Sequence, residues 1–198
     1  MPKRPVETLT EGEVHQLLKL CSRRAPTGVR NAAMIAVMYR AGLRCAELID
    51  LMPKDLDEKA GTLRVRHGKG DKARVVGLDP GAWAIIQRWI DRRKELGFNG
   101  RQHFFCTLKG EPLQSAYIRN LMRRLGQKAG IEKRVHAHAL RHSFAAELAM
   151  ENVPLPVIQH SLGHSSPATT ARYIDHIAPT QVIDTLKART WGTETDDE

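Results

Sequence analysis

The hydrophobic positions of this chain recur mainly with the period of an α-helix. A capping box at residues 10–13 opens the first predicted helix, which carries its apolar residues on one face. Residues 29–41 are nearly all apolar and therefore predict a helix buried on most sides. A short helix is expected over residues 43–48, and Asp79-Pro80 is typical of a helix start. The remaining predicted helices cover residues 115–129, residues 139–150 and a short stretch around residues 182–186.

Two other stretches alternate apolar and polar residues, which is the pattern of a β-strand. They cover residues 62–66 and, less regularly, residues 73–78. The glycine-rich segment between them, residues 67–72, predicts a β-hairpin with Lys69 near its tip. Residues 103–106 are expected to form a third short strand. The pattern predicts an α+β fold that is mainly helical with a small three-stranded antiparallel sheet.

The charge of the chain indicates a polyanionic partner. Lys and Arg number 31 against 22 acidic residues, and four of the acids fall within the last five positions. The first 193 residues therefore carry 31 basic and 18 acidic side chains, a net charge of +13. Such a basic body is typical of proteins that bind nucleic acid, although a basic soluble protein without such a partner has the same composition.

Other features of the composition bear on location. No apolar run approaches the roughly 18 residues of a membrane helix, and the N-terminus has no signal-peptide pattern. The three cysteines are far apart and have no metal-binding spacing. We therefore expect a cytoplasmic protein with reduced cysteines and no membrane contact.

The densest group of candidate functional residues lies between residues 136 and 173. His138, Arg141 and His142 share one face of the predicted helix, opposite its apolar stripe. Prolines and a glycine turn then divide the chain into short segments that can return His164 and Tyr173 toward the same place. An imidazole and guanidinium cluster of this kind is suited to binding an anion.

Each candidate also has an ordinary structural explanation. Arg44 follows a buried segment and could form a structural ion pair with Glu47 or Asp50. A hairpin tip, a turn residue and a half-buried helix residue would account respectively for Lys69, His164 and Tyr173. The functional interpretation therefore depends on the presence of all these residues together in one chain.

That combination resembles the tyrosine recombinase (integrase) family, which includes the Xer and Cre recombinases and the lambda-type integrases. The resemblance covers about residues 8–190. The segments that carry it are residues 41–48 around Arg44, residues 68–74 around Lys69, residues 138–145, residues 162–165 and residues 169–173. It implies the catalytic-domain fold of the DNA breaking-rejoining enzymes, and a site-specific DNA recombinase or integrase.

The resemblance also implies a mechanism. Tyr173 would attack the phosphorus of a phosphodiester and form a 3′-phosphotyrosyl link, with no metal, ATP or other cofactor. Arg44, Arg141 and His164 would bind the non-bridging oxygens, because a guanidinium presents a planar charged fork to phosphate. Lys69 would protonate the leaving 5′-hydroxyl.

Further roles follow from the same resemblance. His138, rather than the neighbouring His136, would take the proton from Tyr173 or hold the phosphate, because it fits the family's H-x-x-R pattern. Glu47 and His142 are expected to steady Arg44 and the active-site helix. The residues expected to contact DNA are Lys72, Arg74, Arg119, Arg123, Arg124 and Arg172.

The expected organisation has three parts: residues 1–8 as a basic arm or linker stub, residues 9–190 as the catalytic domain, and residues 191–198 as an acidic disordered tail. Most family members carry a further helical domain before the catalytic one, so a stand-alone enzyme and a fragment of a longer integrase both stay open. Partners would be double-stranded DNA and other copies of the chain, which would join a synaptic tetramer through residues 174–188. Free in solution, the chain is expected to be a monomer. It would act in the cytoplasm of a prokaryotic cell, encoded by that cell or by its phage or plasmid.

Three rival functions are less consistent with the residues. A type IB topoisomerase would use the same tyrosine chemistry without exchanging strands, but the hairpin of Lys69 and the C-terminal segment resemble those of the Xer recombinases. A non-catalytic DNA-binding protein would not need every active-site position filled. A zinc hydrolase would have to use His136, His138 and His142, but no HExxH glutamate accompanies them and Arg141 would repel the cation.

Overall fold

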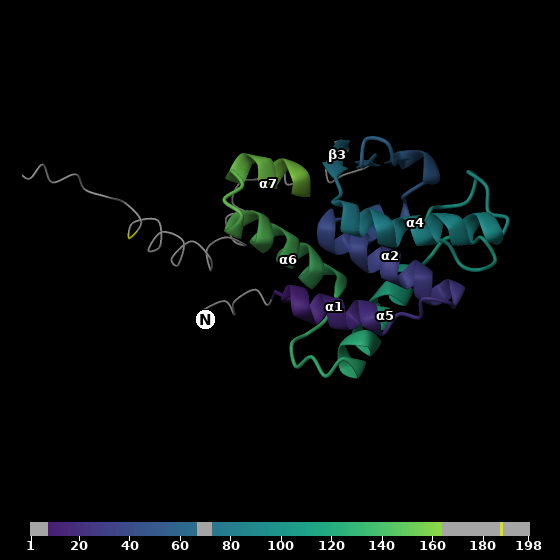
Figure 1. Cartoon of the computed structure of the whole chain (residues 1–198), viewed down its shortest axis with the longest axis horizontal. Coiled ribbons are helices and arrows are strands. Elements are labelled where there is room, and N and C mark those ends of the chain that lie inside the picture. Colours follow the sequence, from purple (N-terminus) through teal and green to yellow (C-terminus); the bar gives the residue numbers. More distant parts are fainter. Residues whose placement is uncertain (1–7, 67–72, 164–186, 188–198) are drawn as a thin grey trace, which may run out of the picture.

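The computed structural model describes residues 8–66, 73–163 and 187, and helices make up most of this part (Figure 1). The predicted capping box is confirmed: the Glu13 backbone N–H donates to Thr10 Oγ1 over 3.2 Å, and the Thr10 N–H donates to the Glu13 carboxylate over 2.7 Å. Asp79 caps another helix, as expected, by accepting from the Ala82 N–H. The helices are α1 (Glu11–Lys19), α2 (Pro26–Arg40), α3 (Cys45–Ile49), α4 (Pro80–Glu95), α5 (Ser115–Lys128), α6 (Ala137–Met150) and α7 (Leu155–Leu162).

The sheet has three antiparallel strands in the order β1 (Leu56–Asp57), β2 (Thr62–Val65) and β3 (Arg74–Gly77). β2 and β3 pair as the predicted hairpin, with Val65 opposite Arg74 and Leu63 opposite Val76. The tip of the hairpin, with Lys69, lies outside the described residues. The third strand is β1, which follows the short 3₁₀ helix η1 (Pro53–Asp55).

The prediction of a strand over residues 103–106 was wrong. Cys106 forms only an isolated bridge with Pro112, outside the sheet. Phe104 and Phe105 are fully buried, and side chains rather than a neighbouring strand satisfy the local carbonyl groups. Trp89 Nε1 and Arg93 Nη1 both donate to the Phe104 carbonyl, over 2.9 and 2.6 Å. This apolar run is therefore a core segment that lies under α4.

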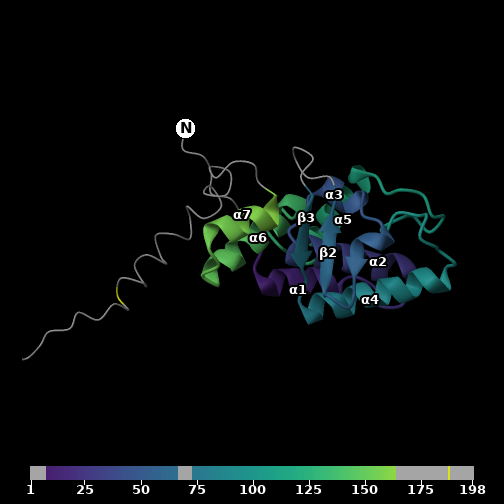
Figure 2. The same cartoon turned by 90° about the horizontal axis from the view of Figure 1, so that it is seen from above.

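α2 is the central helix, as its apolar sequence predicts, and it packs against both α4 and α6. The main core joins α1, α2, α4, α5 and the inner face of the sheet. A smaller core lies between α6 and α7, which sit together at one end of the described part, with α7 against β3 (Figure 2). None of the described helices combines the length and the apolarity that crossing a membrane requires.

The connection from α2 to α3 passes close to α6. Gly42 makes this possible because its φ is +61°, and a Cβ there would lie 2.4 Å from the ring of Phe144. The approach brings the start of α3, which carries Arg44, next to the face of α6 that carries Arg141. The fold thus joins two of the predicted site residues across almost a hundred positions of sequence.

Candidate active site

Three arginine side chains from separate elements converge on the carboxylate of Glu47. Arg44, the N-cap residue of α3, donates from Nη1 to Glu47 Oε1 over 2.7 Å and from its backbone N–H to Oε2 over 2.8 Å. Arg74, the first residue of β3, forms two hydrogen bonds to the same carboxylate, of 3.0 and 2.8 Å. Arg141, from the middle of α6, lies 3.9 Å from Glu47 Oε2. One acid therefore holds three permanent positive charges, and the cluster keeps an excess of positive charge that suits an anion.

The Glu47 side chain is 4% exposed. Burial on its own raises the pKa of this carboxyl group, but the hydrogen bonds from Arg74 and from the Arg44 backbone, with the charge of Arg74, outweigh it. The pKa of Glu47 is lowered to about 2. Glu47 is therefore ionised at neutral pH.

The two arginines expected to bind phosphate differ in exposure. The Arg141 side chain is 1% exposed, and it donates to the carbonyls of Gly42 and Leu162, each over 2.5 Å. The Arg44 side chain is 26% exposed and donates from Nη2 to the Gly163 carbonyl over 3.2 Å. Arg141 is therefore covered by α7 and by the turn after α2, whereas Arg44 is partly exposed. The ordinary alternative for Arg44, an ion pair with Glu47, is also present.

His138 and His142 lie one helical turn apart on α6, with ring centroids 4.2 Å apart in an edge arrangement. Burial lowers the pKa of His138, and the charges of Arg141, His136 and Arg44 lower it further. A lowered pKa keeps the imidazole neutral near pH 7, where it can accept a proton. No group of three histidine, cysteine or acidic side chains among the described residues is arranged to hold a metal ion.

The predicted DNA contacts separate into two groups. Arg119, Arg123 and Arg124 are all exposed on α5. The first two line a cleft of about 440 Å³ whose lining also includes His136, the N-cap residue of α6. Arg74 is not on this surface: it is 5% exposed, and its guanidinium is engaged by Glu47 and by the Ser161 carbonyl. The other predicted site residues lie outside the described residues: Lys69, Lys72, His164, Arg172 and Tyr173.

The place of Arg74 in the arginine cluster was missed by the sequence analysis. A signal for it existed, because Arg74 shares the inward face of its strand with Val76, and both side chains are buried. A buried arginine requires a hydrogen-bond acceptor, but the alternating apolar and polar pattern of a strand does not identify the residue that supplies it. Glu47 lies 27 positions away in the sequence.

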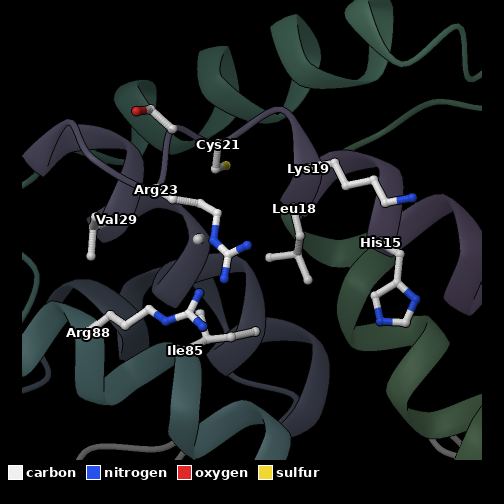
Figure 3. Close-up of a pocket in the computed structure, with 10 residues that line it drawn as sticks. His15, Leu18, Lys19, Cys21, Arg23, Val29, Ile85 and Arg88 are labelled. Atoms are coloured by element: carbon white, nitrogen blue, oxygen red, sulfur yellow. The ribbon is translucent and has the colours of Figure 1, made fainter.

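A second pocket, of about 220 Å³, lies apart from the arginine cluster, between α1, α2 and α4 (Figure 3). Its walls are mainly apolar. Burial raises the pKa of the Cys21 thiol there to about 11, so this cysteine is not a thiolate nucleophile at neutral pH. Four side chains with basic character surround the apolar wall: His15, Lys19, Arg23 and Arg88. None of the residues lining this pocket belongs to the predicted active site.

Comparison with known proteins shows the family of the chain. The model of the phage integrase family matches residues 7–178, and the chain belongs to that family. It is 35% identical over 181 residues to the tyrosine recombinase XerD of Ralstonia nicotianae, covering 89% of this chain and 58% of that protein. It is 36% identical over 172 residues to the tyrosine recombinase XerC of Vibrio campbellii, covering 86% of this chain and 54% of that protein. The chain thus spans little more than half the length of these relatives.

Solved structures show the same fold. The crystal structure of XerA recombinase superposes with a TM-score of 0.82 at 29% identity, over 96% of this chain and 68% of that one. The XerH recombinase bound to its palindromic difH substrate, in a post-cleavage complex, gives a TM-score of 0.76 at 28% identity, over 93% of this chain and 54% of that one. The predicted fold class, a mainly helical tyrosine recombinase catalytic domain with a small antiparallel sheet, is confirmed.

Proposed function

We propose that this chain is the catalytic part of a site-specific DNA recombinase, which cleaves and rejoins DNA strands through a 3′-phosphotyrosyl intermediate without metal or ATP. The observation that carries the proposal is the pairing of Arg44 with Arg141 around Glu47. It places two guanidinium groups beside a histidine whose pKa is lowered. The similarity to XerC and XerD recombinases favours strand exchange over the relaxation that a type IB topoisomerase performs. Residues 9–190 would form the catalytic domain, between a basic arm (1–8) and an acidic tail (191–198).

In the proposed reaction the phenolic oxygen of Tyr173 forms a bond to phosphorus, and the bond from phosphorus to the 5′-oxygen breaks. The proton of Tyr173 passes to His138, and the leaving 5′-oxygen takes a proton from Lys69. Arg44 and Arg141, with His164, would neutralise the charge on the non-bridging oxygens. A 5′-hydroxyl from another strand reverses the step, and the phosphate ester bond is conserved.

Glu47 and His142 would act through their neighbours. Glu47 accepts one hydrogen bond from the guanidinium of Arg44 and another from the Arg44 backbone N–H, so it fixes both the side chain and the main chain of this residue. The ring of His142 lies against that of His138 in an edge arrangement, and this contact would limit the orientations of the His138 imidazole. Neither group needs to touch the phosphate to affect the rate.

The test of this proposal uses a nicked duplex that carries the cognate site, or supercoiled plasmid where that site is not known. In EDTA the chain should give a covalent protein–DNA adduct that survives denaturing electrophoresis and disappears after protease treatment. On plasmid, the corresponding sign is relaxation in EDTA. A chain that binds the cognate duplex and forms no adduct would contradict the proposal.

DNA binding should weaken steeply with salt. The exposed arginines of α5 and the basic cleft beside them are suited to phosphate contacts, to which Lys72 and Arg172 would add. Because each contact releases counterions, the dissociation constant is expected to rise more than about tenfold between 50 and 200 mM salt. Arg123→Gln should reduce the slope of log Kd against log salt by about 1.

The measurement is fluorescence anisotropy with a labelled duplex over a salt series. Arg88→Gln is the matched control, because Arg88 is an exposed arginine of α4 that lines the separate apolar pocket. Its slope should equal that of the unmodified chain. A binding constant that does not change with salt would overturn the assignment of α5 to DNA.

We also propose that the chain is a monomer in solution and that residues 174–188 join neighbouring subunits in a tetramer on DNA. The support is the resemblance to the family, together with the apolar side chains of Val182 and Leu186 in that segment. A photo-crosslinker at position 186 should link two chains on synaptic DNA and give none without DNA. Crosslinks confined to one chain on assembled DNA would contradict the exchange. As a DNA enzyme with bacterial relatives, the protein would act in the bacterial cytoplasm.

A further inference from the structure

Arg74 is more completely engaged than either arginine expected to bind phosphate. Its Nη1 and Nη2 donate to the two oxygens of Glu47 over 3.0 and 2.8 Å, and its Nε donates to the Ser161 carbonyl over 2.8 Å. All three of its nitrogens are therefore engaged, and the residue is 5% exposed. A phosphate could reach this guanidinium only by displacing buried partners.

The C-terminal end of α7 supplies a second shared acceptor for the cluster. Three consecutive carbonyls there accept from three different arginines: Ser161 from Arg74, Leu162 from Arg141, and Gly163 from Arg44. The last carbonyls of a helix lack partners within the helix and carry its partial negative charge, so cations are favoured at this end. The cluster is therefore held between two acceptors, the Glu47 carboxylate and the end of α7.

Gly163 shows how closely Arg74 fits this arrangement. Its φ is +61°, which terminates α7 in the left-handed conformation. A Cβ at this position would lie 2.9 Å from Arg74 Nη1 and 3.2 Å from the central guanidinium carbon. The guanidinium thus lies directly against the backbone of the residue that precedes His164 in the chain.

We propose that Arg74 is a positioning residue for the cleavage reaction. By holding Glu47 and the end of α7 together, it sets the positions of Arg44 and Arg141 relative to each other without itself contacting DNA. Arg44 and Arg141 reach both of the acceptors that Arg74 ties together, so a shift in either acceptor moves both phosphate-binding groups. The inference rests on the proposed function, since it assigns Arg74 to the site where the phosphate would be held.

The chemistry of the side chain explains why arginine is required. A guanidinium makes two parallel hydrogen bonds to a carboxylate and still donates from Nε in another direction. A lysine ammonium retains the charge but cannot reproduce that planar geometry. Arg74→Lys should therefore separate the role of the charge from the role of the geometry.

The test compares Arg74→Lys and Arg74→Gln with the phosphate-contact variant Arg123→Gln and the remote control Arg88→Gln. Single-turnover adduct formation is measured at saturating nicked duplex, and Kd is measured over a salt series. For both Arg74 variants we expect the rate at saturation to fall by about a hundredfold, while Kd and its salt slope stay within about twofold. Arg123→Gln should instead raise Kd and reduce its salt slope, with little change in the rate at saturation. A reduced salt slope with a normal saturated rate would make Arg74 a phosphate contact and overturn the inference, as would unchanged values of all three quantities.

A second measurement needs no DNA and no catalysis. The side-chain ¹⁵Nε–¹H resonances of Arg44 and Arg141, assigned with single Arg→Lys variants, should shift in Arg74→Lys and stay in place in Arg88→Lys. Unchanged resonances in Arg74→Lys would overturn the inference. If the unmodified chain forms no adduct, the proposed function fails, while these spectra still decide whether Arg74 positions the other two arginines. Far-ultraviolet circular dichroism and thermal melting identify any variant that is simply unfolded.

Discussion

Replacement of Tyr173 by phenylalanine is expected to abolish the covalent protein–DNA adduct, lowering its rate of formation by roughly 10⁴-fold or more. The substitution removes only the phenolic oxygen, which in the proposed mechanism forms the bond to phosphorus. Binding to DNA should stay close to that of the unmodified chain, because no positive charge is lost. The two proteins would be compared in EDTA on the nicked duplex, by denaturing electrophoresis.

The chain offers two matched controls, because it contains three tyrosines in all. The hydroxyl of Tyr39 donates to Glu147, and burial and that carboxylate raise the pKa of this tyrosine. The hydroxyl of Tyr117 accepts from Arg30 and donates to Asn31 over 2.9 Å. Both hydroxyls are occupied within the fold, so Tyr39→Phe and Tyr117→Phe should still form the adduct. An adduct that persists in Tyr173→Phe would show that the nucleophile has been wrongly assigned.

Replacement of Glu47 by alanine is expected to lower the free energy of unfolding by about 3–5 kcal/mol, since it leaves buried arginines without their shared carboxylate. Arg74 and Arg141 are both at most 5% exposed, and neither can turn to water without opening the fold. The same change should eliminate adduct formation, because Arg44 loses the group that orients it. Urea unfolding followed by circular dichroism gives the stability.

Glu95→Ala is the appropriate comparison, because Glu95 also pairs with an arginine, Arg92, but its side chain is 65% exposed. Exposed ion pairs contribute little, so this variant should change the free energy of unfolding by less than about 1 kcal/mol. Equal losses in Glu47→Ala and Glu95→Ala would mean that Glu47 is not the centre of a buried network.

The lowered pKa of Glu47 adds a pH signature to this prediction. In the unfolded chain the carboxyl has its ordinary pKa near 4.5, and in the folded chain the value is about 2. The folded state therefore binds the proton less readily, and the stabilisation is fully present above pH 4.5 and lost as the pH falls toward 2. The stability advantage of the unmodified chain over Glu47→Gln should narrow in that window. An advantage that stays constant down to pH 2 would contradict the buried carboxylate.

Local signals predicted most of the helices because helix starts and apolar stripes are properties of neighbouring residues. The capping box at Thr10 and the buried character of α2 are both confirmed. The hairpin of β2 and β3 was predictable for the same reason, since its strands are adjacent in the sequence. The apolar run at residues 103–106 carried no period, and it became a core segment because Trp89 and Arg93 satisfy its carbonyls from α4.

The family resemblance picked out Arg44 and Arg141, and the structure brings both to Glu47. The surroundings of these two arginines could not be predicted from the sequence. The cover over α6 comes from α7 and from the turn at Gly42, and only tertiary packing brings these together. Arg74 was expected to contact DNA, whereas β3 directs its side chain inward, onto an acid 27 positions away in the sequence.

The three carbonyls at the end of α7 bind arginine through main-chain atoms, and this affects how the protein can change over evolutionary time. Side chains at these positions contribute nothing to those hydrogen bonds, so the sequence of α7 can drift while the geometry of the cluster is preserved. The constraints that remain are packing at Leu162, which is fully buried, and close approach at Gly163. An alanine scan of α7 would therefore detect the packing of Leu162 and the close approach at Gly163. It would not detect the hydrogen bonds that the three main-chain carbonyls accept from the arginines. Backbone chemistry, such as an ester in place of the peptide bond whose carbonyl belongs to Ser161, would be needed to reveal it.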